Sequence, residues 1–387
     1  MKRNLPFYKI AIIGAIFCLP FSSFGQADVA KFLNAGIKDA ETLTNLYMEP
    51  FGKAFSTALS GGWYNTGAPH KLLGFDVTLS VNYVMYPESS KEFDLKSKQW
   101  DMLYYNVNGD TKSPTISGED KSDLKVGLQA DIPNPLGGDP IHFENANLFN
   151  LPPGVYPSDL PVPAGIPLPM VNASIGLVKG TEIMGRYVPK ISAVEKFGSF
   201  SLWGAGFKHD FKQWIPVVKL FPFDASIMAA YTKINFSFDD IGYYPTDFEG
   251  IVNELTAVNS QTAITKTQKV ELNTSAFTTN LILSKKLLMF TVYGSVGMYS
   301  SKFDISLKGK YPIPELRVNT SDILNPRVEP ALTDGGVKED PFSIKTKATD
   351  FRAGLGLRVK LLLVTIHADY TYQDYSMITA GLGISFR

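Results

Sequence analysis

Apolar and polar residues alternate with a period of two over several long segments of the chain. The final segment, 378–386, has an apolar residue at every second position and small or polar residues between them. The same alternation runs over 350–359 and 364–371, and much earlier over 75–83. A period of two is typical of a β-strand with one apolar and one polar face. These four segments are therefore predicted as strands.

Weaker alternation predicts further strands between the early segment and the late ones. They cover 91–104, 122–132, 166–178, 181–188, 197–211, 223–237, 269–284 and 287–301. Phe303, Ile305 and Leu307 also alternate, which allows another pair within 302–347. The sequence thus predicts an all-β fold of about 12–14 strands.

Long strands with strongly apolar faces favour a membrane barrel over a soluble sheet, although a soluble antiparallel sheet with one wet face shows the same alternation. The clear strands run for roughly 10 residues, which is the length that spans a membrane. Tyr83, Tyr370 and Tyr372 lie near strand ends, as in an aromatic girdle. Because a sheet in lipid must close to pair its backbone groups, we predict a transmembrane antiparallel β-barrel. A soluble sandwich is the alternative.

Connection lengths support this prediction when the C-terminus is placed in the periplasm. Bacterial outer-membrane barrels have short periplasmic turns and long outer loops. The short joins, all on the inner side, are 178–180, 285–286 and 360–362. The long joins, all on the outer side, are 133–165, 238–268 and 302–347. Two joins, 105–121 and 212–222, are long for the inner side. The Pro-rich stretch 133–169 is predicted as a loop, either a packed lid or plain disorder.

The chain begins with the pattern of a secretory signal peptide. Lys2, Arg3 and Lys9 precede an apolar stretch over 10–21, and small residues follow before Gln26. This order predicts a cleavable signal over 1–25, with a buried N-terminal helix as the alternative. The single cysteine, Cys18, falls within it, so the mature chain is expected to hold no disulfide.

Helical spacing replaces the alternation in the segment that follows, 26–70. Apolar residues recur near a spacing of 3.6 from Phe32 to Tyr47. Pro50 and Gly52 are expected to end this helix, with a second short helix after them. We predict that 26–70 forms a hatch inside a barrel made by 71–387. The alternative is a periplasmic extension that never enters the barrel.

Composition and charge exclude some classes of function. Lys plus Arg and Asp plus Glu are 37 each, so a basic surface for nucleic acid is not expected. The four histidines are scattered without metal-ligand spacing, and neither enzyme chemistry nor a cofactor is predicted. Asp239, Asp240 and Asp247 are either a calcium site or, as the simpler interpretation, a solvated outer loop.

Charged and polar residues at the inward positions of the predicted strands are the candidate lumen lining. Such positions face the barrel interior because their neighbours in sequence face lipid. The candidates are Asp76, Asp350, Arg352, Arg358, His367 and Asp369.

The last strand resembles the C-terminal assembly signal of outer-membrane barrels. The stretch "TAGLGISF" (379–386) has Thr379, Gly381, Ile384 and Phe386 at the matching positions. Arg387, one residue beyond the aromatic, departs from the pattern. The resemblance implies that the barrel assembly machinery is a partner, beside outer-membrane lipid.

The mature chain also resembles an uncharacterised outer-membrane β-barrel family of Bacteroidota. The matching stretches are "FLNAGIKDAETLTNLYMEPFGKAF" (32–55), "GWYNTGAPHKLLGFDVTLSVN" (62–82), "KGTEIMGRYVPK" (179–190) and "GAGFKHDFKQWIP" (204–216). Those barrels are similar in layout to the long-chain fatty-acid transporter family, in which a helical hatch precedes the strands. The likeness is architectural, because no ligand-pocket motif is carried over.

Two functions follow as predictions for a cell outer-membrane protein. The first is passive transport of a small, perhaps hydrophobic, solute past the hatch. The second is a non-transport structural or interaction barrel whose outer loops bind a partner. An apolar cavity running from the outer loops to the hatch would favour transport, whereas a lumen filled with ion pairs would favour the second function.

Overall fold

The computed structural model describes residues 26–156, 163–192, 198–239, 241–245, 264–321, 327–332 and 337–386. The predicted signal peptide, Cys18, Asp240, Asp247 and Arg387 lie outside these ranges. Within them, none of the helices combines the length and the apolar character needed to cross a membrane.

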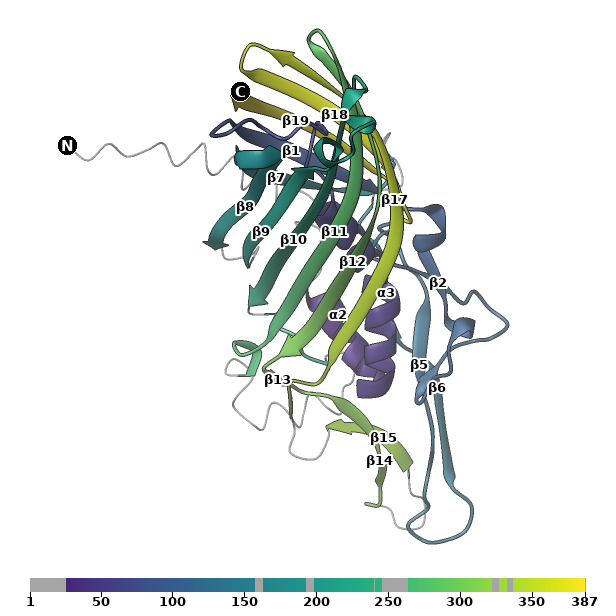
Figure 1. Cartoon of the computed structure of the whole chain (residues 1–387). Helices are drawn as coiled ribbons and strands as arrows, with labels where there is room; N and C mark the ends of the chain where they lie inside the picture. Colours follow the sequence, from purple (N-terminus) through teal and green to yellow (C-terminus); the bar gives the residue numbers. More distant parts are fainter. Residues whose placement is uncertain are drawn as a thin grey trace, which may run out of the picture.

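Ten antiparallel strands of the described chain close into one barrel (Figure 1), which confirms the predicted fold class. They are β1 (Phe75–Met85), β7 (Gly165–Gly176), β8 (Thr181–Ser192), β9 (Ser199–Asp210), β10 (Asp224–Asp239), β11 (Lys269–Leu287), β12 (Phe290–Lys308), β17 (Ser343–Leu361), β18 (Val364–Tyr372) and β19 (Met377–Phe386). Closure joins the first strand to the last, with Phe75 opposite Phe386 and Val84 opposite Met377. On its other side β1 pairs with β7.

The predicted number of strands, about 12–14, is wrong, since the described barrel has ten. The segments expected as strands over 91–104 and 122–132 belong to small sheets within the connection from β1 to β7. These sheets contain β2 (Glu92–Asp94), β3 (Leu103–Tyr104), β4 (Lys112–Pro114), β5 (Lys125–Ile132) and β6 (Ile141–Asn150). Alternation indicates a strand with one apolar face, but it does not indicate which sheet the strand joins.

Phe303, Ile305 and Leu307, which suggested another pair of strands within 302–347, belong to the barrel strand β12. Between β12 and β17 the described residues form two small sheets outside the barrel, of β13 (Lys310–Tyr311) with β16 (Lys338–Glu339) and of β14 (Pro314–Asn319) with β15 (Arg327–Leu332). Part of the stretch predicted as a Pro-rich loop is strand β6, which pairs with β5.

The long and short connections separate to opposite ends of the barrel. The end that carries the C-terminus, here called the inner end, has the short turns, and the opposite, outer end has the long connections (Figure 1). The join 105–121, which did not fit an inner turn, lies within the single outer connection from β1 to β7. The join 212–222 is an inner connection and contains the 3₁₀ turns η5 (Lys212–Trp214) and η6 (Val218–Leu220).

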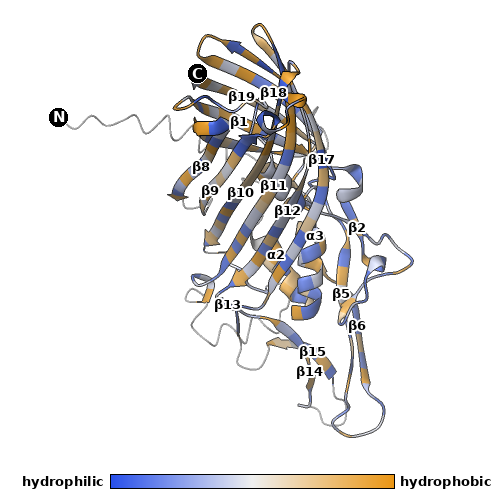
Figure 2. Cartoon of the chain, in the orientation of Figure 1, coloured by the Kyte–Doolittle hydropathy of each residue, from blue (hydrophilic) through white to orange (hydrophobic). Residues whose placement is uncertain are grey.

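Side chains alternate between a lipid-facing outside and a buried inside along the wall. Leu355 is 66% exposed, whereas Arg352, three residues earlier and on the other face, is 1% exposed. Figure 2 shows the corresponding change from orange to blue along the strands. The apolar outward face is suited to lipid. The inward face is polar in the inner half of the barrel, whereas in the outer half it carries apolar residues, such as Leu168, Phe236 and Phe303, that pack on the N-terminal segment.

The N-terminal segment enters the barrel with its last helix. It comprises α2 (Gln26–Lys31), η1 (Phe32–Ala35) and α3 (Ile37–Ser60). The lumen helix α3 contacts strands around the barrel, namely β1, β7, β10, β11, β12 and β17. The expected break at Pro50 and Gly52 is wrong, since α3 is continuous through both. A Cβ at Gly52 would lie 2.6 Å from Cδ1 of Phe303 on β12, so this glycine allows close packing rather than ending the helix.

The outer connections pack on the first half of the lumen helix and on the turn before it. Leu95, Leu103, Ile116 and Val126 share one buried apolar cluster with helix residues such as Leu43. The carboxylate of Asp39, in the first turn of α3, accepts the backbone N–H groups of residues 101, 102 and 103. The remaining 3₁₀ turns are η2 (Glu88–Ser90) and η3 (Leu95–Ser97), in the outer connection from β1 to β7, and η4 (Val178–Gly180), in the turn from β7 to β8 at the inner end. The helix therefore joins the outer loops to the wall.

A charge placed on the outward face should destabilise the barrel only in lipid. We expect Leu355→Arg to lower the free energy of unfolding in phospholipid vesicles by roughly 2–4 kcal/mol near the bilayer midplane. The control is Val107→Arg, at an exposed position of an outer connection, which should have no effect. Denaturant titration in vesicles measures both. Equal effects of the two substitutions would contradict the assigned lipid-facing surface.

Candidate functional site: the closed lumen

The C-terminal end of the lumen helix stops near the middle of the barrel, where wall side chains bind its last carbonyls. Asn82 Nδ2 donates to the carbonyl of Ala58 at 2.7 Å, and Arg352 donates to that of Ser60 at 2.7 Å. Arg186 donates to the carbonyls of Leu59, at 3.0 Å, and of Gly61. The last carbonyls of a helix lack partners within the helix and carry partial negative charge, which explains two buried arginines at this point.

Trp63 of the lumen segment and Asn172 of the wall hold Arg186 in place. Its guanidinium lies 3.8 Å from the centre of the Trp63 ring, a cation–π contact. Its Nε donates to Asn172 Oδ1, and Asn172 Nδ2 donates to the carbonyl of Gly62 at 3.1 Å. The guanidinium thus has partners on several sides despite its burial.

Beyond the helix the chain continues through the inner half of the lumen toward the start of β1. Tyr64 donates to Ser295 at 2.6 Å, and the backbone N–H of Gly67 donates to Ser284 at 2.9 Å. Ser295 belongs to the wall strand β12 and Ser284 to the wall strand β11. Residues 61–70 are therefore fixed to the wall along their length.

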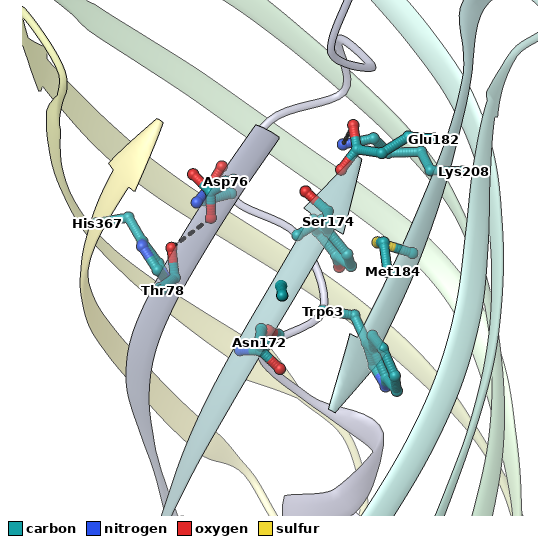
Figure 3. Close-up of a pocket in the computed structure, with 13 residues that line it drawn as sticks. Trp63, Asp76, Thr78, Asn172, Ser174, Glu182, Met184, Lys208 and His367 are labelled. Atoms are coloured by element: carbon teal, nitrogen blue, oxygen red, sulfur yellow. Dashed lines mark hydrogen bonds and ion pairs between the residues drawn. The ribbon is translucent and has the colours of Figure 1, made fainter. Parts of the chain in front are cut away.

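A buried charged cluster closes the inner end. Glu182 accepts from the backbone N–H of His70 at 2.9 Å and lies 3.0 Å from His70 Nδ1. Lys208 Nζ lies 3.2 Å from the same carboxylate, and His70 Nε2 lies 3.1 Å from Ser385 Oγ. Figure 3 shows Glu182 and Lys208 side by side above the cavity. The cluster connects the lumen segment with β8, β9 and β19.

The space between these groups is small. A cavity of about 30 Å³ lies among residues of β1, β7, β8, β18 and the lumen segment (Figure 3). A second cavity, between α3 and strands β12 and β17, measures about 10 Å³. A cavity of roughly 10–15 Å³ is the smallest that holds one water molecule, so the first has room for about two water molecules and the second for one at most.

The structure brings four of the predicted lumen residues together in the inner half. Arg358 lies 3.8 Å from Asp76, and His367 faces the cavity beside them. Neither ring nitrogen of His367 has a hydrogen-bond partner among the described residues. Asp369 accepts from the Tyr293 hydroxyl at 3.0 Å.

The other two predicted lumen residues lie elsewhere. Arg352 belongs to the helix cap described above. Asp350 lies half-buried near the outer end, where it accepts the backbone N–H of Asp374 at 2.7 Å. Asp239 forms an ion pair with Lys269 at 3.1 Å, and the described residues contain no group of three or more metal-ligating side chains.

The four residues of the predicted assembly signal have distinct places in β19. Thr379 is buried and donates to Asn82 Oδ1 at 3.0 Å. A Cβ at Gly381 would lie 2.2 Å from the His367 ring, so only glycine fits there. Ile384 and Phe386 face outward, and the Phe386 ring lies 5.8 Å from that of Phe75. Their role as an assembly signal stays a prediction.

Sequence reasoning missed Arg186, Glu182, Lys208 and Asn82. All four occupy inward positions of strands, and the alternation rule that selected Arg352 also selects them. Glu182, Met184 and Arg186 are spaced by two along β8, and all three are buried. The weaker alternation of β8 and β9, which have glycine at positions 185, 204 and 206, hid Glu182, Arg186 and Lys208. Asn82 lies on the clear strand β1 and was missed because it is uncharged, whereas the predicted lining was limited to charged residues and one histidine.

Removal of one cap arginine should loosen the lumen helix. We expect Arg352→Met to lower the free energy of unfolding by roughly 1.5–3 kcal/mol, since it removes a charged hydrogen bond and leaves a buried carbonyl unpaired. Amide hydrogen exchange should accelerate over the last turns of α3. The control Arg317→Met, in an outer hairpin, should change neither quantity. Unchanged exchange in Arg352→Met would show that the cap does not hold the helix.

Comparisons with known proteins place the chain in a family. No curated protein matches the sequence. Among solved structures, the translocator domain of the autotransporter NalP from Neisseria meningitidis is similar with a TM-score of 0.30 and 12% identity, covering 89% of this chain and 97% of that one. The Pseudomonas putida toluene transporter TodX is similar with a TM-score of 0.23 and 9% identity, covering 86% and 96%. Scores this low carry no inference about function. The model of a family of unknown function (DUF6588) matches residues 1–386, and the chain belongs to this family.

Proposed function

We propose that the protein is a closed outer-membrane barrel that acts through its outer surface, as an interaction protein, and does not conduct solute along its axis. The observation that carries this proposal is the filled lumen. The chain occupies the interior from Asp39, bound by an outer connection, to His70, bound at the inner end. By the criterion set from the sequence, transport would need an apolar cavity that runs from the outer loops to the hatch, and neither of the two cavities beside the lumen segment is large enough to form one.

The contacts of the lumen segment favour a permanent part of the fold over a gate. Displacement of α3 would break the charged hydrogen bonds from Arg186 and Arg352, each worth roughly 1.5–3 kcal/mol. It would also expose the apolar cluster that α3 shares with the outer connections. A few kcal/mol of ligand binding is too little to offset both changes.

The outer surface offers clefts of suitable size for a partner. One of about 260 Å³ lies between α3, the start of the β1–β7 connection and the β18–β19 turn, with Pro50, Phe93 and Tyr375 in its lining. A neighbouring cleft of about 410 Å³ is lined by Glu88, Ser89, Glu92, Phe93, Asp94 and Lys112. Apolar and charged groups thus meet on a surface built from folded connections, as interaction surfaces commonly do.

The proposal includes the route and setting predicted from the sequence. Residues 1–25 would direct export and be removed, and the barrel assembly machinery would insert the barrel into outer-membrane lipid. An origin in Bacteroidota and the layout shared with fatty-acid transporters stay predictions.

Single-channel recording tests the closed state. We expect the full mature chain to give no steady conductance in planar bilayers, because its lumen segment leaves no continuous path. A variant without residues 26–70 should conduct, since both α3 and the segment that closes the inner end would then be absent. Steady conductance by the full chain, equal to that of the deletion variant, would refute the closed barrel.

Photo-cross-linking on intact cells tests the other half of the proposal, that the outer surface binds a partner. A cross-linker in place of Ser89, which lines both outer clefts, should capture a discrete partner. The matched position is Leu136, an exposed residue in the β5–β6 connection. Capture that is absent at Ser89, or equal at both positions, would count against the surface.

One observation favours the second candidate, passive transport of a small apolar solute. Strands β7 and β8 pair only from Asn172–Arg186 to Gly176–Glu182. The outer part of β7, residues 165–171, has no ladder partner on that side in the described chain. Unpaired backbone is costly in lipid, so this seam is the part of the wall that opens most easily. A solute entering there would come from the membrane and avoid the axis.

The seam can be tested by restoring ladder donors. Pro167 and Pro169 of β7 lack a backbone N–H. If the seam admits solute, Pro167→Val with Pro169→Val should reduce uptake of the apolar dye N-phenylnaphthylamine into vesicles several-fold. The control Pro314→Val, in an outer hairpin, should leave uptake unchanged. Uptake by the unaltered protein no faster than by empty vesicles would exclude this function.

A further inference from the structure

The connections at the inner end of the barrel share an unusual composition. Each of the five carries lysine beside exposed apolar residues, and together they are called the inner rim. The rim consists of 71–74 (KLLG), 177–180 (LVKG), 211–223 (FKQWIPVVKLFPF), 285–290 (KKLLMF) and 360–363 (KLLL). Its most exposed apolar residues are Leu220 at 85%, Leu288 at 91% and Leu362 at 94%. Figure 2 shows orange at the turn tips of this end.

Three leucines of the rim have a backbone conformation that leucine rarely adopts. Leu73, Leu288 and Leu362 have φ of 59°, 55° and 56°. Glycine and asparagine adopt this left-handed region with less strain than leucine does. Three separate turns therefore keep a strained leucine with its side chain toward the surroundings. Folding of the turn does not require leucine at these positions, so its contact with something outside the barrel is the better explanation.

The charge of the five rim segments is entirely positive. The five rim segments contain seven lysines and neither Asp nor Glu. Lys71, Lys179, Lys219, Lys285 and Lys286 are exposed, and none of them takes part in an ion pair within the described part of the chain. A partner that neutralises this end must be anionic. Among the acids near the rim in sequence, Glu182 is paired with Lys208, and Asp210 and Asp224, which flank the segment 211–223, are half-buried.

The lipid-facing belt runs into the rim without a polar break on β17, and with Lys285 between Leu283 and Leu287 on β11. Leu287 and Phe290 flank the β11–β12 turn, and Leu361 and Val364 flank the β17–β18 turn, all of them exposed. The apolar surface that contacts acyl chains is thus continuous with the exposed tips. Apolar contact at the belt and cationic contact just beyond it are the two features that a phospholipid leaflet satisfies together.

We propose that the inner rim is a binding surface for anionic phospholipid of the inner leaflet. The lysine ammonium groups bind the phosphates, and the leucine tips lie among the glycerol and upper acyl groups. The turns are then held at the depth of the headgroups. This inference is independent of what the outer surface binds.

Lipid selectivity of the whole protein tests the inference. The full mature chain is placed in vesicles of phosphatidylethanolamine with either spin-labelled phosphatidylglycerol or spin-labelled phosphatidylcholine, and the protein-bound lipid fraction is measured. We expect phosphatidylglycerol to be preferred about threefold or more, with the preference lost in high salt. The rim variant replaces five exposed lysines by Gln: Lys71, Lys179, Lys219, Lys285 and Lys286.

A matched variant and a second kind of substitution complete the test. The matched variant replaces outer lysines by Gln: Lys96, Lys98, Lys121, Lys125 and Lys266. The rim variant should lose the preference and the matched variant should keep it. Leu288→Asn with Leu362→Asn should raise the thermal midpoint in detergent, where only the strain matters, and lower the bound lipid fraction in vesicles.

The opposite outcomes overturn the proposal. They are no preference for phosphatidylglycerol in the unaltered protein, equal loss in the rim and matched variants, or unchanged lipid binding in the leucine variant. Capture of a periplasmic protein by the rim in place of lipid would also overturn it, since lysines and leucines then serve a protein interface.

Discussion

Every backbone polar group inside a membrane needs a hydrogen-bond partner, and this constraint organises the molecule. It requires the sheet to close, which the pairing of β1 with β19 achieves. It applies again inside the barrel, where α3 ends with carbonyls that have no helical partner. There the wall supplies Asn82, Arg186 and Arg352. The arginines of the lumen are thus a consequence of ending a helix within a barrel.

Toward the inner end, charged and polar groups of the wall likewise bind backbone groups of the lumen segment. Once α3 stops, the chain continues as irregular backbone, which needs partners from the wall at each step. Gly67 and His70 obtain them from Ser284 and Glu182. Glu182 is itself buried and is balanced by Lys208. Of the six residues predicted to line the lumen, Arg352 binds the chain that blocks it, whereas Asp76, Arg358 and Asp369 contact other residues of the wall.

Strand periodicity predicted the barrel and the direction of side chains because both depend on local alternation. Asp76, Arg352 and Arg358 are buried as that pattern requires. Alternation does not encode which sheet a strand joins, so segments near Phe93 and Val126 were assigned to the wall although they cover α3. Pro50 and Gly52 were misread for a related reason. Their cost to a helix is local, whereas the packing of Gly52 against Phe303 depends on a strand far away in sequence.

The filled lumen also explains how the wall tolerates its incomplete ladder. Along the unpaired part of β7, the inward residues Ile166, Leu168 and Met170 are buried in one apolar cluster with Phe55 and Leu59 of α3. The seam is therefore backed by packed protein, where water is excluded from the inside and prolines reduce the number of unpaired N–H groups. A barrel of the same sequence without its helix would place that seam between lipid and water. The incomplete pairing of β7 therefore depends on the packing of α3 against it, and loss of α3 should destabilise this part of the wall.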